Sequence, residues 1–172
     1  MKKIVIRKAK PTDATKIARV HVKTWQAAYK GMFPAKYLRE LSIPKRTASW
    51  RKHLIDNQKQ HQTLVATNGP SIMGFISVGP SGDRGASEKI GELRALYINP
   101  KFWHKGIGSA LMQRSFQFLK KSGFREVRLW ALTGNEAARA FYRAKGWKSD
   151  NARKKFKRGG VIRTIVRYKI KL

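Results

Sequence analysis

Residues 99–119, "NPKFWHKGIGSALMQRSFQFL", place a glycine turn directly before a helical pattern. Gly106 and Gly108 are one residue apart and follow His104 and Lys105, which can both donate hydrogen bonds. A helix N-terminus presents free backbone N–H groups and partial positive charge, and glycines let a ligand approach that backbone closely. The combination favours phosphate binding, and a tight turn without a ligand is the alternative.

Two familiar phosphate motifs do not describe this turn. A P-loop requires Gly-x-x-x-x-Gly-Lys-Ser/Thr, which the sequence lacks. The dinucleotide fingerprint requires a third glycine, and Leu111 stands in its place. It also requires a doubly wound parallel sheet and an acidic residue ~20 positions further on. The turn therefore belongs to neither class of nucleotide-binding protein.

The turn lies within a regular succession of expected strands and helices. Glycine and proline turn signals separate short β-rich runs, and apolar residues at helical spacing mark the helices. Strands are predicted at 3–9, 62–67, 71–79, 89–99 and 124–132, with two more between 147 and 172. Helices are predicted at 11–31, 34–41, 44–57, 106–122 and 135–146. In the helix after the turn, the residues expected to face inward are Ile107, Leu111, Ser115, Phe118 and Leu119.

This order predicts an α/β (α+β) fold. The strand–helix–strand unit at 89–131 should form a right-handed parallel crossover. The other strands follow one another closely, so we expect a mixed, mostly antiparallel twisted sheet with helices on both faces. A length of 172 residues suits one domain spanning 1–172, without linkers or repeats.

Composition excludes several kinds of chemistry. The chain has no cysteine, which rules out disulfides, zinc–thiolate sites and thiol nucleophiles. Its four histidines are scattered without metal-ligand spacing. No apolar run approaches the ~18 residues that span a bilayer, and the N-terminal apolar stretch is too short for a signal peptide. We expect a cytoplasmic protein that binds neither metal nor membrane.

The charge is strongly positive. Thirty-nine Lys+Arg against nine Asp+Glu give a formal net charge of +30. Such a chain should attract polyanions, although high charge also simply maintains solubility. The basic residues are spread along the chain, which argues against a dedicated nucleic-acid arm. Non-specific polyanion binding and a homodimer both remain open.

Two motifs carry a family resemblance. "LYINPKFWHKGIGSALM" and "LWALTGNEAARAFYRAKGW" resemble the GNAT superfamily of N-acetyltransferases, and the resemblance covers nearly the whole chain. In that family the turn pattern Gln/Arg-x-x-Gly-x-Gly/Ala binds the pyrophosphate of acetyl-CoA. Here Trp103 replaces the Gln or Arg. His104 replaces a frequent glycine of the family, whereas Lys105, Gly106, Ile107, Gly108 and Ser109 match the pattern. The resemblance implies that His104 and these five residues bind the coenzyme.

The second motif lies on the last predicted helix. The family pattern is Asn, small residues, Phe-Tyr and then Gly-Phe/Trp. The matching residues are Asn135, Ala138, Phe141, Tyr142, Gly146 and Trp147. The resemblance implies that acetyl-CoA is the cosubstrate and that an amine of a small molecule or protein attacks its thioester directly.

The resemblance also implies roles on the coenzyme side. The main chain of Leu96, Tyr97 and Ile98 would pair with the pantetheine arm, and an N–H at Leu96 or Tyr97 would polarise the thioester carbonyl. Tyr142 is the candidate general acid, since a phenol with a pKa near ~10 is protonated at neutral pH. Asn135 would bind the pantetheine amide, cap the last helix, or do both.

The general base is less clearly marked. Many family members carry a glutamate at the position of Glu92, acting directly or through water. Strand alternation predicts that Glu92, Arg94 and Leu96 share one face, and a salt bridge is the alternative role for Glu92. His21 fits a packed core histidine better than a base. The branch that acetylates ribosomal proteins uses a glutamate on the next strand, where Trp130 stands here.

The acceptor is expected near the first helix. Trp25 and Tyr29 are four residues apart, and in the family this helix walls the acceptor pocket, so an aromatic-lined amine site is one interpretation. Core packing is the other. The net charge would repel a free polycation, which favours a small amine or an amine on an acidic molecule. The alternative function is a basic nucleic-acid- or ribosome-binding module that binds CoA without chemistry; "RKKFKRGG" is its only short basic–aromatic stretch.

Overall fold

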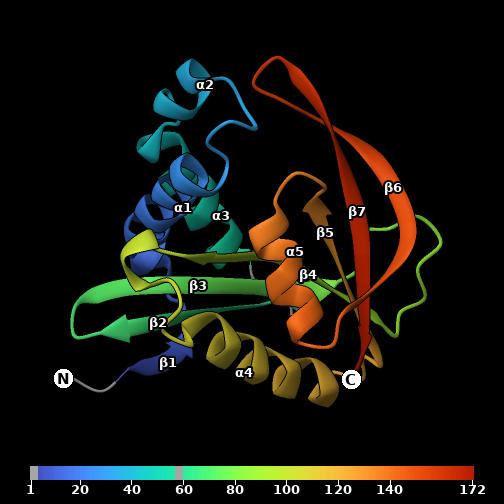
Figure 1. The fold of residues 1–172 in the computed structure, drawn as a ribbon. Helices are drawn as coiled ribbons and strands as arrows, with labels where there is room; N and C mark the ends of the chain where they lie inside the picture. The colour runs from blue at the N-terminus through green and yellow to red at the C-terminus, as the bar shows by residue number, and fades with distance from the viewer. Residues whose placement is uncertain (1–3, 57–59) are drawn as a thin grey trace.

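Seven strands form one sheet in the order β1-β2-β3-β4-β5-β7-β6 (Figure 1). The structure is a computed structural model that describes residues 4–56 and 60–172. The strands are β1 (Val5–Lys8), β2 (Gln62–Asn68), β3 (Ser71–Pro80), β4 (Ile90–Ile98), β5 (Glu126–Leu132), β6 (Lys148–Arg158) and β7 (Val161–Lys171). All neighbours pair antiparallel except β4 and β5, which are parallel. The predicted mixed, mostly antiparallel sheet is confirmed.

Helices cover both faces of this sheet, as the sequence predicts (Figure 1). They are α1 (Ala14–Ala28), α2 (Ala35–Arg39), α3 (Ile43–Ile55), α4 (Ile107–Lys121) and α5 (Glu136–Ala144). Residues of α1 and α3 pack on one face, and residues of α4 and α5 pack on the other. Residue 3 of the predicted first strand and residue 57 of the predicted third helix lie outside the described residues. No helix within the described residues is long and apolar enough to cross a membrane.

The inner face of α4 anchors the element that follows the glycine turn. Ile107, Leu111, Ser115 and Leu119 are buried at helical spacing, and Phe118 is half-buried at the edge of the same cluster. Each fully buried large apolar side chain stabilises the fold by about 1.5–3 kcal/mol. The helix start is therefore held rigidly against the sheet.

β4 and β5 separate soon after they begin to pair. Their parallel pairing covers three positions and ends at Glu92 and Arg128. No pairing follows between residues 93–98 and residues 129–132, although the structure describes both strands in full. Backbone groups that would otherwise bond across the two strands are left available there. The separation opens a space in the middle of the sheet.

A β-bulge in β4 overturns one prediction. Val78 pairs with Leu93 and Ser77 pairs with Ala95, so Arg94 has no residue opposite it on β3. As a result Leu93 and Leu96 both pack on the α4 side, whereas Ala95 packs on the α1 side.

The expectation that Glu92 and Leu96 share a face is therefore wrong. One extra residue shifts the alternation by one position. Glu92, next to Leu93, belongs to the α1 side of the sheet, opposite Leu96.

Candidate functional site

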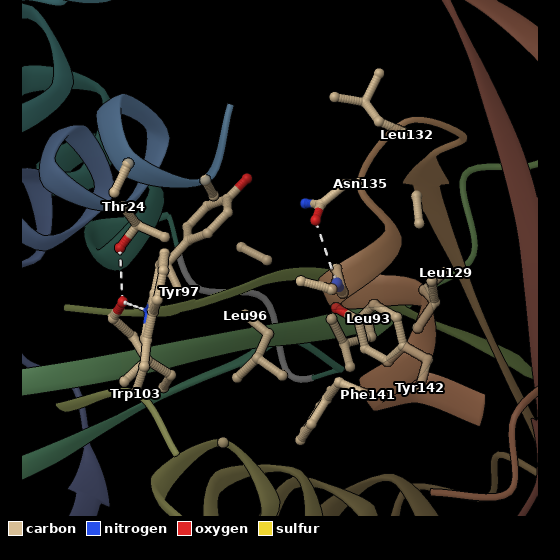
Figure 2. A pocket seen from close by; sticks show the side chains of 18 of the residues that line it. Thr24, Leu93, Leu96, Tyr97, Trp103, Leu129, Leu132, Asn135, Phe141 and Tyr142 are labelled. Carbon is tan, nitrogen blue, oxygen red and sulfur yellow. Dashed lines mark hydrogen bonds between the residues drawn. The ribbon is translucent and has the colours of Figure 1, made fainter. Parts of the chain in front are cut away.

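A cavity of about 800 Å³ lies where β4 and β5 separate. Side chains from β4, β5 and α5 surround it in Figure 2, with Thr24 of α1 at its far side. Its lining brings together most of the residues singled out from the sequence: Tyr29, Leu96, Tyr97, Ile98, His104, Lys105, Gly106, Ile107, Gly108, Ser109, Asn135 and Tyr142. Glu92 and Trp25 are not among the residues that line it.

The glycine turn leaves the first N–H groups of α4 free. Gly106 is the N-cap residue in the left-handed conformation, with φ of 75°. The first helical bond runs from the N–H of Ala110 to the carbonyl of Gly106. The N–H groups of Ile107, Gly108 and Ser109 have no partner among the described residues. A Cβ built on Gly106 would meet nothing within 4 Å, so this side of the turn is open to a ligand.

The second glycine has a different physical reason. A Cβ on Gly108 would lie 3.4 Å from Cζ of Phe141 and 3.8 Å from Cγ1 of Ile98. The first turn of α4 is therefore packed closely against α5 and the end of β4. Gly106 leaves space for a ligand, whereas Gly108 lets three elements meet.

The carbonyl oxygen of Ile98, at the end of β4, is held by two side chains (Figure 2). The indole N–H of Trp103 donates to it over 2.7 Å. The hydroxyl of Thr24 lies 3.0 Å from it and 2.8 Å from the carbonyl of Val20, so one hydrogen is shared between two acceptors. Sequence reasoning missed both contacts, because they depend on how α1 and the turn fold onto β4.

Tyr142 lies on α5 and projects into the cavity. Its side chain is 9% exposed, and Figure 2 shows its hydroxyl turned toward the interior. That hydroxyl makes no hydrogen bond with any residue the structure describes. Burial raises the pKa of Tyr142 above its usual value, and the electrostatic effect of Tyr97 raises it further by a smaller amount. The phenol is therefore protonated at neutral pH and free to donate.

Asn135 caps α5 and also borders the cavity (Figure 2). Its Oδ1 accepts a hydrogen bond from the N–H of Ala138 over 3.2 Å. Its NH₂ group has no partner within the described chain. The predicted capping role is confirmed, and a donor remains for a ligand.

The aromatic residues of α1 divide between cavity and core. Tyr29 lines the cavity, whereas Trp25 is 6% exposed and lies behind it. Their rings meet edge to face with centroids 4.8 Å apart, and Trp25 also stacks on Phe33 at 5.9 Å. Trp25 thus supports the position of Tyr29 without bordering the cavity itself.

His21 is a packed core histidine, as the sequence indicates. Its Nδ1 accepts a hydrogen bond from Nε1 of Trp50 over 3.0 Å, and its ring stacks on Tyr97 with centroids 4.7 Å apart. Burial, helped by the charge of Arg46, lowers the pKa of His21 to about 3. The imidazole is neutral and lies outside the lining of the cavity.

Glu92 lies where the cavity closes, at the last paired position of β4 and β5. Its Oε2 accepts a hydrogen bond from the backbone N–H of Gly82 over 2.8 Å. The side chain is partly exposed.

Charged groups beside the cavity form a network that the sequence did not reveal. Asp83, with a side chain 10% exposed, accepts hydrogen bonds from Nε1 of Trp130 over 2.9 Å and from Arg167 over 3.0 Å. Arg128 lies 3.7 Å from it, and Lys154 lies 3.8 Å from it. Burial acts to raise the pKa of Asp83, but the hydrogen bonds from Trp130 and Arg167 and the charges of Lys154 and Arg167 lower it overall. The loop containing Asp83 is thereby fixed against the β5–β7–β6 part of the sheet.

Comparison with known proteins identifies relatives of the chain. Residues 19–147 match the acetyltransferase (GNAT) family. YuaI of Bacillus subtilis, an uncharacterized N-acetyltransferase, is 31% identical over 143 residues, which cover 82% of this chain and 78% of that protein. A spermidine N(1)-acetyltransferase of Thermoplasma acidophilum is 24% identical over 160 residues, or 86% of this chain and 90% of the relative.

Solved structures show the same fold. The PaiA N-acetyltransferase of Thermoplasma acidophilum, crystallised with coenzyme A, superposes with a TM-score of 0.78 and 24% identity over 98% of this chain and 99% of that one. YncA of Salmonella typhimurium, solved with acetyl-CoA, gives a TM-score of 0.71 and 17% identity over 98% of this chain and 93% of that one.

Proposed function

Because the chain belongs to the acetyltransferase (GNAT) family, we propose that it transfers the acetyl group of acetyl-CoA to a primary amine of a small molecule or protein. One observation carries the proposal. The free N–H groups of α4 and the hydroxyl of Tyr142 open into the same cavity, between strands whose backbone groups are unpaired. The spermidine acceptor in the name of one relative supports an amine as the second substrate.

The residues present fit coenzyme A. Its pyrophosphate is anionic and suits the three unpartnered N–H groups at the start of α4, where Gly106 leaves open space. Its pantetheine arm carries amide groups, which suit the free NH₂ of Asn135 and the edge of β4 from Leu96 to Ile98 that does not pair with β5. On that edge the carbonyl of Ile98 is already bonded to Thr24 and Trp103. Lys105 adds a cation beside the turn.

When bound, acetyl-CoA supplies an acetyl group whose carbon–sulfur bond breaks as the amine nitrogen forms the new carbon–nitrogen bond. Tyr142 holds the proton that the departing sulfur needs, because burial keeps its hydroxyl protonated. A backbone N–H of β4, at Leu96 or Tyr97, stabilises the negative charge that develops on the carbonyl oxygen. Both groups sit on rigid elements, which favours a fixed reaction geometry.

Glu92 is the proposed proton acceptor. Its carboxylate lies outside the lining of the cavity, so we assign it to act through intervening water. The hydrogen bond from the backbone N–H of Gly82 orients this carboxylate. His21 is a poor candidate, since its ring is buried among aromatic side chains.

The alternative of a non-catalytic nucleic-acid-binding module is not favoured. The family that matches and the relatives named above are acetyltransferases.

A thiol-release assay tests the proposed function. The purified chain is incubated with acetyl-CoA and a panel of primary amines, and calorimetry measures coenzyme A binding separately. We expect coenzyme A to bind and at least one amine to release the thiol. Absence of thiol release with every amine would remove the proposed function, and coenzyme A binding without release would favour the non-catalytic alternative.

A further inference from the structure

The cavity is poor in acidic groups. Glu136 is the one acidic residue in its lining within the described chain. That carboxylate is already bonded to Arg139 over 3.0 Å and to Arg143. A polyamine acceptor would bring several positive charges to a wall that offers no free carboxylate, which is electrostatically unfavourable.

Arg94 supplies the opposite charge on the same wall. It lines the cavity, is exposed, and occupies the bulge of β4, a feature that redirects side chains beside functional sites. One of its N–H groups donates to the carbonyl of Pro80 over 2.8 Å. A guanidinium has five N–H donors, so several remain for a ligand.

Arg94 differs from its basic neighbours in having no acidic partner among the residues that the structure describes. Arg128 and Arg167 each form ion pairs with Asp83. None of the ion pairs formed within residues 4–56 and 60–172 involves Arg94. Its charge is therefore not cancelled locally.

The position of Arg94 separates it from the proposed coenzyme turn. Burial lowers the pKa of His53 and of His61, and the next largest cause for both is the positive charge of Arg94. His53 lies on α3, so this charge acts on the α1–α3 side of the sheet, opposite α4. The α1 side of the cavity also carries Tyr29 and Met32, whose side chains offer apolar surface.

We infer that the acceptor amine carries a carboxylate, which Arg94 binds, and an apolar body that packs against Tyr29 and Met32. This inference rests on the proposed function and narrows its substrate class to amino-acid-like amines. Arg–carboxylate pairs are charge-assisted and often bidentate, so they orient a small substrate as well as bind it. The amine would then face the space between Leu96 and Tyr142.

Matched pairs of amines test the inference. Thiol release is compared for L-phenylalanine and 2-phenylethylamine, which differ only in the carboxylate, and for spermidine. A peptide amide that begins with aspartate distinguishes an acidic protein N-terminus from a free amino acid. We expect kcat/KM for phenylalanine to exceed that for 2-phenylethylamine by about 10- to 100-fold, the range of a hydrogen-bonded charge pair.

The variant Arg94→Gln should remove this preference, and Arg114→Gln should retain it. Arg114 is an exposed arginine of α4 whose side chain bonds Gln117, so its replacement makes the same change in net charge away from the α1 side. Equal or better use of 2-phenylethylamine or spermidine, or a preference that survives Arg94→Gln, would overturn the inference. A peptide substrate preferred over the free amino acid would also overturn it.

Product binding provides a second readout that does not need turnover. Calorimetry compares N-acetylphenylalanine with N-acetyl-2-phenylethylamine on the protein saturated with coenzyme A. The inference is supported if N-acetylphenylalanine binds more tightly than N-acetyl-2-phenylethylamine and this difference is lost in Arg94→Gln. Equal binding of the two compounds, or no binding, overturns it. Failure of the proposed function looks different, since no amine of the panel would then release the thiol, whether or not coenzyme A binds.

Discussion

Trp103 donates its indole N–H to the carbonyl oxygen of Ile98 over 2.7 Å, joining the glycine turn to the end of β4. These are the two segments proposed to hold the pyrophosphate and the pantetheine arm. One hydrogen bond therefore fixes the spacing between two parts of the coenzyme site.

Replacing Trp103 with phenylalanine tests this link. The variant keeps an aromatic ring and loses the N–H, and a hydrogen bond contributes about 0.5–1.5 kcal/mol. We expect the dissociation constant of coenzyme A, measured by calorimetry, to rise about 2- to 10-fold. Trp130→Phe is the control, because its N–H bonds Asp83 instead of β4. Equal losses of coenzyme A affinity in Trp103→Phe and Trp130→Phe would contradict the link.

Gly106→Val should weaken coenzyme binding by about tenfold or more, because it closes the approach to the backbone of α4. Gly85 is the matched control. Its φ is 73°, against 75° at Gly106, and neither has an atom within 4 Å of an added Cβ. Both variants should lose similar stability, about 1–2 kcal/mol from backbone strain, as thermal unfolding will show. Unchanged coenzyme affinity in folded Gly106→Val would remove the turn from the site.

Tyr142→Phe removes one hydroxyl and retains the ring. Loss of a positioned acid should lower kcat by about 10²-fold with little change in coenzyme affinity. Tyr168→Phe is the control, since its buried hydroxyl accepts from Arg139 at 3.1 Å and lies outside the cavity lining. A Tyr142→Phe enzyme as fast as the parent, with chemistry rate-limiting, would reduce Tyr142 to a packing role.

The pH profile gives a second test of Tyr142. Burial raises the pKa of Tyr142 above its ordinary value. The phenol therefore stays protonated at any pH below the raised pKa and loses its proton only above that pKa. We therefore expect kcat not to fall between neutrality and pH ~10. A decline that begins near pH 8 and is absent from Tyr142→Phe would show a lowered pKa instead.

Glu92→Gln tests the proposed base. The amide oxygen can still accept from Gly82, so the local structure should persist while the proton acceptor is lost. We expect kcat/KM to fall about 10²-fold near pH 7 and to recover at higher pH, where the amine loses its proton to solvent. Glu88→Gln, on an exposed loop residue, controls for the change in charge. A loss that is equal at every pH would argue for a structural role.

The elements with strong local signals were predictable from the sequence. α4 combines a glycine with positive φ at its start and apolar residues at helical spacing, and both signals depend on neighbours within a few positions. The cap at Asn135 is likewise local. The parallel pairing of β4 and β5 followed from the helix between them.

The features that were missed depend on contacts between distant segments. The bulge at Arg94 exists only in the register with β3, which strand alternation cannot reveal. For Trp25 the sequence left core packing and an acceptor site open, and the stacking on Phe33 places its ring in the core. The bond from Trp103 to Ile98 requires the turn to fold back onto its own strand.

The edge strand β6 also affects how copies of this chain meet. Six of its eleven residues are lysine or arginine, and its pairing with β7 is irregular between Ser149 and Arg153. If two copies extended their sheets through β6, these rows of like charge would face each other, which disfavours edge-to-edge aggregation. Any self-association of the chain is therefore expected to use a different surface.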